Sequence, residues 1–257
     1  MPRYAANLGF LFTEQPFLDR FGAAKRAGFE GVEFASPYDF AADDIAQRLN
    51  DNNLACVLFN LPMGERSKGD FGIGCLPGRE AEFRDGVARA IDYAATLGCP
   101  RVNCIAGKVP EGADPLELRA ILVSNLRFAA REFKRAGMTL LVEPINTEDV
   151  PGFLVSRASH GAEILVKTGE DNAGLQFDIY HTAMMKDDPV ATLDRYAAIV
   201  RHVQFADAPG RHEPGTGAIA LKRVFARLDR MGYTGWTSAE YRPSKRTEET
   251  LDWMESE

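Results

Sequence analysis

The ten residues RAGMTLLVEP, Arg135–Pro144, contain the unit from which the fold can be deduced. An amphipathic helical pattern ends at Gly137, the apolar run Thr139–Val142 follows, and the run ends in the acidic Glu143. A glycine just past a helix adopts the left-handed conformation that lets the chain turn back. A short run of apolar and β-branched residues after such a turn predicts a buried strand.

The same unit recurs along the whole chain. Helical patterns that end in Gly28, Gly98, Gly169 and Gly232 are each followed by a short apolar run. With the less marked cases, the predicted strands are Tyr4–Leu8, Gly31–Phe34, Leu54–Phe59, Arg101–Ile105, Thr139–Val142, Gly174–Phe177, His202–Phe205 and Trp236–Ala239. The predicted helices are Pro16–Ala27, Ala41–Asn50, Arg79–Leu97, Pro115–Ala136, Ser159–Thr168, Val190–Ile199, Leu221–Met231 and Thr247–Glu255.

Eight alternating strands and helices in 257 residues predict an α/β fold, a (β/α)₈ barrel formed by one domain over residues 1–257. A doubly wound open sheet is the alternative, because periodicity alone does not show whether a sheet closes. We find no linker, low-complexity tract or block of charge in the sequence that would mark a second domain.

Composition excludes several classes of partner. The chain has 30 Lys and Arg against 37 Asp and Glu, a net charge of −7, which argues against a nucleic-acid or anionic-membrane surface. No apolar run approaches the roughly 20 residues of a membrane helix. The apolar stretch Ala5–Phe12 lacks the flanks of a secretory signal. The four cysteines form no C-x-x-C motif, and we expect reduced thiols in a cytoplasmic protein.

Two predicted βα loops are long. The segment Asn60–Gly78 contains five glycines, and loops of this length are often lids or binding loops, with a surface excursion as the alternative. The segment Ala206–Ile219 is the second. The string Gly215–Ala220 matches G-x-G-x-x-A, but it does not open a helix directly after a strand and has no acidic residue about 20 positions on. We therefore reject a dinucleotide site.

Polar side chains stand near the ends of four consecutive predicted strands: Glu143, Asp178, Gln204 and Glu240. In a barrel these ends meet at one mouth. Three carboxylates at close range repel one another unless a cation lies among them. Oxygen ligands without thiolate or histidine favour Mg²⁺ or Mn²⁺ over zinc. The alternative, acids that merely cap the following helices, explains one Asp but poorly explains the whole series.

Several further segments accompany this quartet and together carry a resemblance. They are Glu143-Pro-Ile-Asn146, Gln176–His181, His202–Asp207, Glu213–Gly217, Ala239–Pro243, Asn7, Val32-Glu33-Phe34, Asn60-Leu61-Pro62, Leu76–Glu80 and Asn103–Lys108. Over essentially its whole length the chain resembles the hydroxypyruvate isomerase family, which belongs to the xylose-isomerase-like barrels. The 2-oxo-tetronate isomerases are a sister group. Hydroxypyruvate is favoured as the substrate by the residues at Asn60–Pro62, Asn103-Cys104 and Glu143–Asn146. Related sugar epimerases usually have His where this chain has Gln204.

The resemblance implies an aldose-ketose type isomerase that interconverts hydroxypyruvate and tartronate semialdehyde (2-hydroxy-3-oxopropanoate) in glyoxylate metabolism. The carbonyl moves between C2 and C3 through a metal-stabilised enediolate, which requires a base, its conjugate acid and an electrophile. The resemblance implies that Glu143 and Glu240 share the proton transfers and that His181 lies near the substrate oxygens. Lys108 and Arg211 are the basic candidates for the substrate carboxylate, with solvated surface positions as the alternative.

The other histidines carry weaker expectations. We assign His202 to packing inside the barrel and give His160 no functional role. The role of His212 is left undecided. The partner is a small hydroxy-keto acid, and a homo-oligomer is possible. A non-catalytic barrel that binds sugar acids is the rival from another class, which the four intact strand-end ligands disfavour. A metal nuclease would want several His ligands and a basic face, but the chain has four His and an acidic balance.

Overall fold

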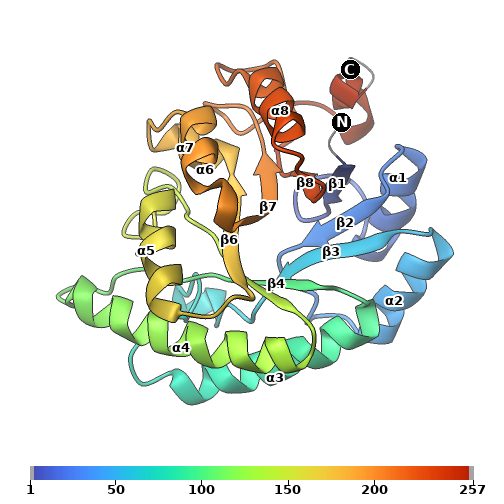
Figure 1. Cartoon of the computed structure of the whole chain (residues 1–257). Coiled ribbons are helices and arrows are strands. Elements are labelled where there is room, and N and C mark those ends of the chain that lie inside the picture. The colour runs from blue at the N-terminus through green and yellow to red at the C-terminus, as the bar shows by residue number, and fades with distance from the viewer. Residues whose placement is uncertain (1–2, 255–257) are drawn as a thin grey trace.

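The computed structural model describes residues 3–254. Their strands form one closed parallel barrel in chain order, and its seam is the pairing of the first strand with the last, with Arg3 opposite Trp236 and Ala6 opposite Ala239 (Figure 1). The strands are β1 (Arg3–Asn7), β2 (Gly31–Phe34), β3 (Ala55–Asn60), β4 (Arg101–Cys104), β5 (Thr139–Val142), β6 (Ala173–Asp178), β7 (Val200–Phe205) and β8 (Trp236–Ala239). The closed seam confirms the barrel and excludes the open sheet.

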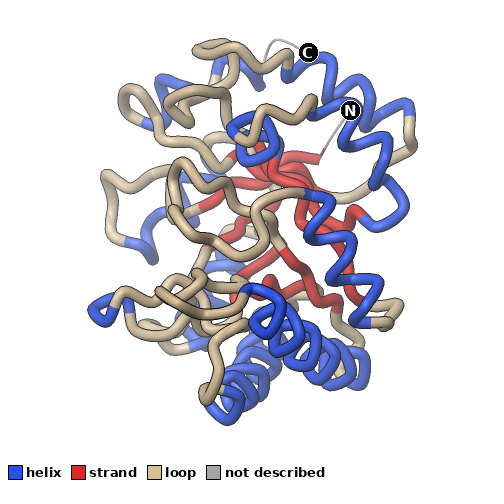
Figure 2. The backbone as a smooth tube through the Cα atoms, turned by 90° about the vertical axis from the view of Figure 1, so that its left-hand side faces the viewer, coloured by secondary structure: helices blue, strands red, loops and turns tan. Residues whose placement is uncertain are grey.

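Helices surround the strands on the outside, as the tube in Figure 2 shows. They are α1 (Arg20–Arg26), α2 (Ala42–Asp51), α3 (Glu80–Leu97), α4 (Pro115–Arg135), α5 (Ala158–Thr168), α6 (Ile179–Met184), α7 (Pro189–Tyr196) and α8 (Leu221–Arg230). Short 3₁₀ turns precede α1 at Phe17–Asp19, interrupt the 60–78 loop at Arg66–Lys68 and follow α7 at Ala197–Ile199. The helices bury apolar faces against the outside of the barrel, which supplies most of the hydrophobic core.

The structure differs from the sequence prediction after β8. The predicted helix Thr247–Glu255 consists of two 3₁₀ turns, Thr247–Thr250 and Asp252–Met254, and Glu255 lies outside the described residues. The reason is tertiary. The Thr247 backbone N–H donates to the Glu14 carboxylate at 2.6 Å, and the Tyr241 hydroxyl donates to the Thr250 carbonyl at 3.1 Å. The Tyr241 hydroxyl takes the Thr250 carbonyl, which a continuous α-helix would pair with the Met254 N–H, and that N–H donates to the Leu251 carbonyl at 2.9 Å instead.

A second difference is the short helix α6, which the sequence did not predict. The chain enters α6 directly from β6, because the Asp178 carboxylate accepts hydrogen bonds from the backbone N–H groups of Tyr180 and His181 at 2.7 and 3.3 Å. Asp178 therefore acts as the N-cap of α6. This turn brings His181 back over the end of β6.

The inside of the barrel has an apolar floor beneath a polar layer. Ala5, Val57, Leu58, Leu141 and Trp236 form a small cluster separate from the main core. Strand alternation places Ala5, Leu141 and Trp236 on the same inward faces as Asn7, Glu143 and Glu240, further from the mouth. Gly31 makes room here, since a Cβ on it would lie 2.9 Å from the Trp236 ring. The floor places the polar layer of the barrel at the mouth, where the strands end.

The long loop 60–78 is packed against the β4–α4 connection. The Leu61 and Cys75 N–H groups donate to the carbonyls of Asn103 and Ala106, each at 2.8 Å. Gly72 has φ +89°, and a Cβ there would lie 2.4 Å from the Ile105 carbonyl oxygen. A role for this loop as a lid stays a prediction.

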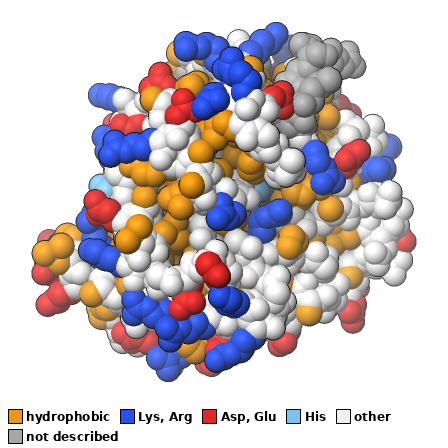
Figure 3. All heavy atoms as spheres, viewed as in Figure 1, with side chains coloured by type: hydrophobic (Ala, Val, Ile, Leu, Met, Phe, Trp, Pro, Cys, Tyr) orange, Lys and Arg blue, Asp and Glu red, His pale blue; other side chains and the backbone are white. Residues whose placement is uncertain are grey.

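Two predictions made from composition can be compared with the described chain. The four cysteines are buried free thiols. Among residues 3–254, none of the helices has both the length and the apolar character needed to cross a membrane. On the face drawn in Figure 3, acidic and basic side chains are interspersed around exposed hydrophobic ones.

Candidate active site at the carboxyl ends of the strands

Three predicted site residues, Glu143, Asp178 and Glu240, lie buried where β5, β6 and β8 end. Gln204 lies on β7, where its Cα is the register partner of Asp178. Because all strands of the barrel run in the same direction, these ends meet at one mouth. The four predicted residues therefore lie at the same end of the barrel.

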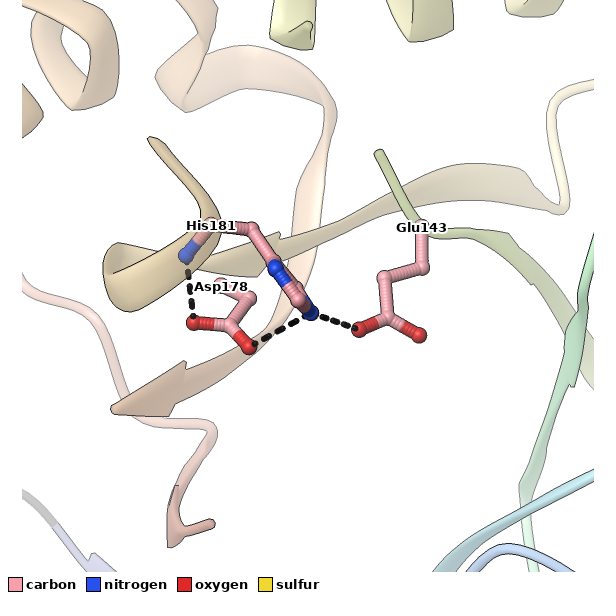
Figure 4. Close-up of side chains that lie close together, drawn as sticks. All are labelled: Glu143, Asp178 and His181. Carbon is pink, nitrogen blue, oxygen red and sulfur yellow. Dashed lines mark hydrogen bonds and ion pairs between the residues drawn. The ribbon is translucent and has the colours of Figure 1, made fainter. Parts of the chain in front are cut away.

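Glu143, Asp178 and His181 form the tightest group (Figure 4). His181 Nε2 lies 3.8 Å from Glu143 Oε1 and 3.6 Å from Asp178 Oδ2, and the three potential ligand atoms lie within 4.8 Å of one another. Asp178 Oδ1 caps α6, whereas the buried Oδ2 has no hydrogen-bond partner in the part of the chain that the structure describes. A buried carboxylate oxygen without a donor is costly unless a cation or a ligand meets it.

Asn146 fixes which nitrogen of His181 carries the proton. The Asn146 side-chain oxygen accepts from the Asp149 N–H at 2.8 Å, so its amide Nδ2 faces His181 Nδ1 at 2.6 Å. The Asn146 backbone N–H also points at Nδ1, at 3.4 Å. Since both groups donate, Nδ1 accepts and the proton is on Nε2. Burial lowers the pKa of His181 to about 4, so the ring is neutral at pH 7 and presents an N–H donor to the site.

Arg211 connects Glu240 to this group. Its Nη2 donates to Glu240 Oε2 at 2.5 Å and lies 3.6 Å from Asp178 Oδ2. The guanidinium lies between two aromatic rings, 4.6 Å from the centroid of Phe10 and 4.9 Å from that of Tyr180. Cation–π contacts of this kind hold an arginine in place without using its hydrogen bonds. The Nε atom of Arg211 is buried and has no hydrogen-bond partner among residues 3–254.

Gln204 lies in a hydrogen-bonded row beneath the carboxylates. Its Nε2 donates to Glu33 Oε1 at 2.6 Å, and its Oε1 accepts from Gln176 Nε2 at 2.6 Å. The structure thus brings Glu143 and Asp178 together with His181 and joins Glu240 through Arg211. Within the described chain it does not bring in Lys108, which is exposed, with its ammonium 6.0 Å from the ring centroid of Phe71 in the 60–78 loop.

The mouth brings three buried carboxyl groups close to one guanidinium. Burial, together with the neighbouring Asp178, raises the pKa of Glu143 to about 8. Burial also raises the pKa of Glu240 well above its usual value, although Arg211 opposes this. With Glu143, Asp178 and Glu240 ionised, the Arg211 guanidinium would leave two negative charges. A divalent cation would balance that charge, and the unpartnered Asp178 Oδ2 offers it a ligand atom. The donor set therefore fits a hard divalent metal ion.

Several residues of the site were not assigned roles from the sequence. Asn7 Nδ2 donates to Glu240 Oε1 at 2.8 Å, and Asn103 Nδ2 donates to Glu143 Oε2 at 3.0 Å. Asn7, Glu33 and Asn103 were visible only as parts of the family resemblance. Strand alternation could have identified them, because each is a polar residue on the inward face of a predicted strand, near its carboxyl end.

The remaining histidines have structural positions. His202 is buried inside the barrel, as predicted, but its Nε2 lies 2.7 Å from Glu33 Oε2, so it is part of a polar network as well as of the packing. The ring nitrogen Nδ1 of His212 lies 2.7 Å from the Arg242 carbonyl oxygen and links two βα loops. His160 lies half-buried on α5.

Comparison with known proteins agrees with this geometry. A family model described as "Xylose isomerase-like TIM barrel" matches residues 21–257. The chain belongs to this family. The Escherichia coli K12 hydroxypyruvate isomerase is 43% identical over 255 residues, which cover 99% of each chain. The Cupriavidus necator 2-oxo-tetronate isomerase is 42% identical over 254 residues, covering 99% of this chain and 98% of that relative.

Solved structures extend the comparison. A crystal structure described as AP endonuclease, family 2, from Brucella melitensis has a TM-score of 0.97 at 40% identity and covers 99% of this chain and 98% of its own. An Escherichia coli 3-keto-D-glucoside 4-epimerase has a TM-score of 0.84 at 17% identity, which shows the shared fold alone. The predicted family and the predicted enzyme class, an isomerase, are therefore confirmed.

Proposed function

We propose that this isomerase interconverts hydroxypyruvate and tartronate semialdehyde. The observation that carries the proposal is a pair of buried carboxyl groups, Glu143 and Glu240, both with raised pKa values. They share the mouth with the Asp178 Oδ2 atom, which has no hydrogen-bond partner among the described residues. The Glu143 pKa of about 8 suits a group that must take up and release a proton near pH 7. The name of the Escherichia coli relative supports the choice of substrate.

A divalent ion, Mg²⁺ or Mn²⁺, fits the site as its cofactor. Glu143, Asp178, Glu240 and the amide oxygen of Gln204 would hold it, and when bound it would supply Lewis acidity for the charge that develops on the substrate oxygens. His181 is not one of the proposed ligands, because its Nε2 carries a proton. We assign His181 instead as a donor to a substrate oxygen.

The two glutamates move the protons. One carboxylate removes a proton from C3 of hydroxypyruvate while the C2 carbonyl oxygen acquires one, which gives the enediol. Loss of the proton from the C3 hydroxyl and return of a proton to C2 by the other glutamate complete tartronate semialdehyde. Asn103 and Asn7 donate to Glu143 and Glu240 and hold each carboxyl group in place. Enediolate chemistry of this kind needs a base and an acid on hand together.

Arg211 is the proposed partner of the substrate carboxylate. It is buried at the mouth, and its unpartnered Nε leaves a donor available for a second hydrogen bond. A guanidinium and a carboxylate form paired hydrogen bonds that orient the substrate as well as bind it. Lys108, the other basic candidate, is exposed and would reach the substrate only at the edge of the 60–78 loop.

An NMR panel tests the assignment. Hydroxypyruvate, 2-oxo-tetronate and ketohexoses are each incubated with the protein and Mg²⁺ or Mn²⁺, and we expect the highest kcat/KM for hydroxypyruvate. The Cupriavidus necator relative supports 2-oxo-tetronate as the second candidate, and a higher kcat/KM for that substrate would replace the first. No turnover of any substrate with metal present would favour the non-catalytic barrel.

We also propose a cytoplasmic location, which the four buried free thiols support, since such thiols persist in a reducing compartment. Oxidation of these cysteines to disulfides in protein isolated without reductant would contradict it. A homo-oligomer is the remaining proposal, and the molar mass measured by light scattering against the 28.3 kDa chain decides it.

A further inference from the structure

A further buried carboxylate belongs to the hydrogen-bonded row that contains Gln204. Glu33, on β2, is fully buried, and its carboxylate has the side chains of Asn7, Gln204, His202 and Ser238 as hydrogen-bond partners. Asn7 Nδ2 and Gln204 Nε2 donate to its Oε1 at 2.9 and 2.6 Å, and His202 Nε2 lies 2.7 Å from its Oε2. A charged group in this position has to serve the residues that surround it, because burial without partners would be costly.

Glu33 decides which way the Gln204 amide faces. An ionised carboxylate only accepts hydrogen bonds, so the Gln204 atom beside it must be the NH₂ group. The amide oxygen is therefore turned away from Glu33, where it accepts from Gln176 Nε2. Gln176 does not fix this orientation itself, because its own oxygen has no hydrogen-bond partner and its amide could be turned to suit either atom.

The orientation matters because only the oxygen of an amide is a good ligand for a hard cation. Gln204 is the one member of the proposed ligand set that could present the wrong atom, whereas Glu143, Asp178 and Glu240 present oxygen in any orientation. Glu33 also reaches Glu240, since Asn7 Nδ2 donates to both carboxylates.

We propose that Glu33 is a positioning residue that keeps the amide oxygen of Gln204, rather than its nitrogen, available to the metal ion. The inference rests on the proposed function, in which Gln204 is a ligand, and goes beyond it by assigning the residue that orients this ligand. Residues that orient metal ligands from behind typically change metal affinity about 10–100-fold when they are replaced.

The test measures Mn²⁺ affinity without substrate, from the electron paramagnetic resonance signal of free Mn²⁺. In Glu33→Gln the residue beside Gln204 can also donate, so the Gln204 amide can turn over. We expect Mn²⁺ to bind about 10–100-fold more weakly than to the wild type. In the double variant Glu33→Gln with Gln204→Glu, donor and acceptor are exchanged and an oxygen faces the site again, so Mn²⁺ should bind more tightly than to Glu33→Gln.

Loss of the Glu33 charge could by itself weaken Mn²⁺ binding, and a double-mutant cycle separates the two causes. In a Gln204→Leu background there is no amide to orient, so Glu33→Gln should change Mn²⁺ affinity by no more than about twofold. Ser238→Ala removes a hydroxyl that contacts His202 at 3.2 Å and also bonds Glu33, but it leaves the Glu33 carboxylate beside the Gln204 amide; it is the matched control and should bind Mn²⁺ like the wild type. Melting temperatures check that each variant folds.

Three results would overturn the proposal: wild-type Mn²⁺ affinity in Glu33→Gln, an equal loss from Glu33→Gln in the Gln204→Leu background, or a double variant that binds no better than Glu33→Gln. If Glu33→Gln does not fold, Glu33→Asp, whose shorter side chain draws the carboxylate away from the Gln204 amide, takes its place in the same double-mutant cycle with the same expected outcomes. Failure of wild-type protein to isomerise hydroxypyruvate would count against the proposed function and leave these Mn²⁺ comparisons standing.

Discussion

Glu143 and Glu240 have the same charge and nearly the same depth, but different neighbours. Asn103 donates to Glu143, whose pKa is raised to about 8, while Glu240 is paired with Arg211 and Asn7. A carboxyl group that burial has shifted toward neutrality can exchange a proton with carbon at low cost. This shared property is the reason for assigning the proton transfers to these two residues.

Replacing either glutamate should separate binding from proton transfer. In Glu143→Gln and Glu240→Gln the side chain keeps an oxygen but cannot act as a carboxylate base, so turnover should fall about 10²–10⁴-fold. Wild-type protein in D₂O should exchange deuterium into C3 of hydroxypyruvate, and each variant should do so far more slowly. Near-normal exchange in both variants with Mn²⁺ bound would leave the two residues as ligands only.

The raised pKa of Glu143 should also appear in the stability of the metal-free protein. In the unfolded chain this carboxyl titrates near its usual value of 4.5, whereas in the folded protein burial raises its pKa to about 8. Between these values the folded state binds more protons than the unfolded state. The contribution to the free energy of unfolding is therefore complete below about pH 4.5 and is lost as the pH rises through about 8.

We therefore expect the melting temperature in EDTA to fall more steeply between about pH 5 and pH 8 for the wild type than for Glu143→Gln, which has no proton to lose at this position. The comparison with the variant cancels the other titrating groups. If the melting temperatures of the two proteins fall in parallel across this pH range, Glu143 has an ordinary pKa.

At the scale of a single element, the 206–219 loop is organised by one buried carboxylate. Asp207 Oδ1 accepts from the N–H groups of Ala208 and Ile219, and Oδ2 accepts from that of Gly215, each at 2.9 Å. Gly217 lies so close that a Cβ on it would meet the Ala208 carbonyl oxygen at 2.3 Å. The result is a compact loop that delivers Arg211 to the mouth.

Asp207→Ala should loosen this loop and affect substrate binding. Loss of the hydrogen bonds to a charged acceptor should cost about 3 kcal/mol of stability. The KM for hydroxypyruvate should rise about tenfold or more as Arg211 loses its position. Asp188→Ala is the control: it removes the N-cap of α7, a hydrogen bond to Ala191 at 2.9 Å, and should cost about 1 kcal/mol with no change in KM. Equal KM values in the two variants would refute the role of the loop.

For the whole molecule, the three carboxyl groups at the mouth predict stabilisation by a divalent ion, which would balance their charge when they ionise. At a Mn²⁺ concentration about 100 times Kd the folded state should gain about 2.7 kcal/mol. For a chain of this size that corresponds to a rise in melting temperature of about 5–10 °C. Asp178→Asn still offers an oxygen to cap α6 but lacks the charge, so the rise should be less than half as large. An undiminished rise in Asp178→Asn would place the ion elsewhere.

The sequence by itself determined the barrel and the mouth. Each repeat has a helical pattern, a glycine and a short apolar run. These signals are local, so the type and order of the elements could be predicted without knowing the tertiary structure. Glu143, Asp178, Gln204 and Glu240 were predicted to share one end because parallel strands place their carboxyl ends together. The exception, the segment Thr247–Glu255, has a helical pattern whose described part forms 3₁₀ turns, because the Tyr241 hydroxyl takes the Thr250 carbonyl.

Only the tertiary structure decided the contacts within the site. That Arg211 pairs with Glu240, that Asn146 places the His181 proton on Nε2, and that Glu33 faces the NH₂ group of Gln204 all depend on residues 28 to 171 positions apart or on the exact course of a loop. No periodic pattern encodes such pairings, because hydrogen bonds depend on distances of tenths of an ångström between side chains from different strands. The types of side chain at the mouth could be predicted from the sequence. Their pKa values and orientations depend on burial and on the neighbouring side chains.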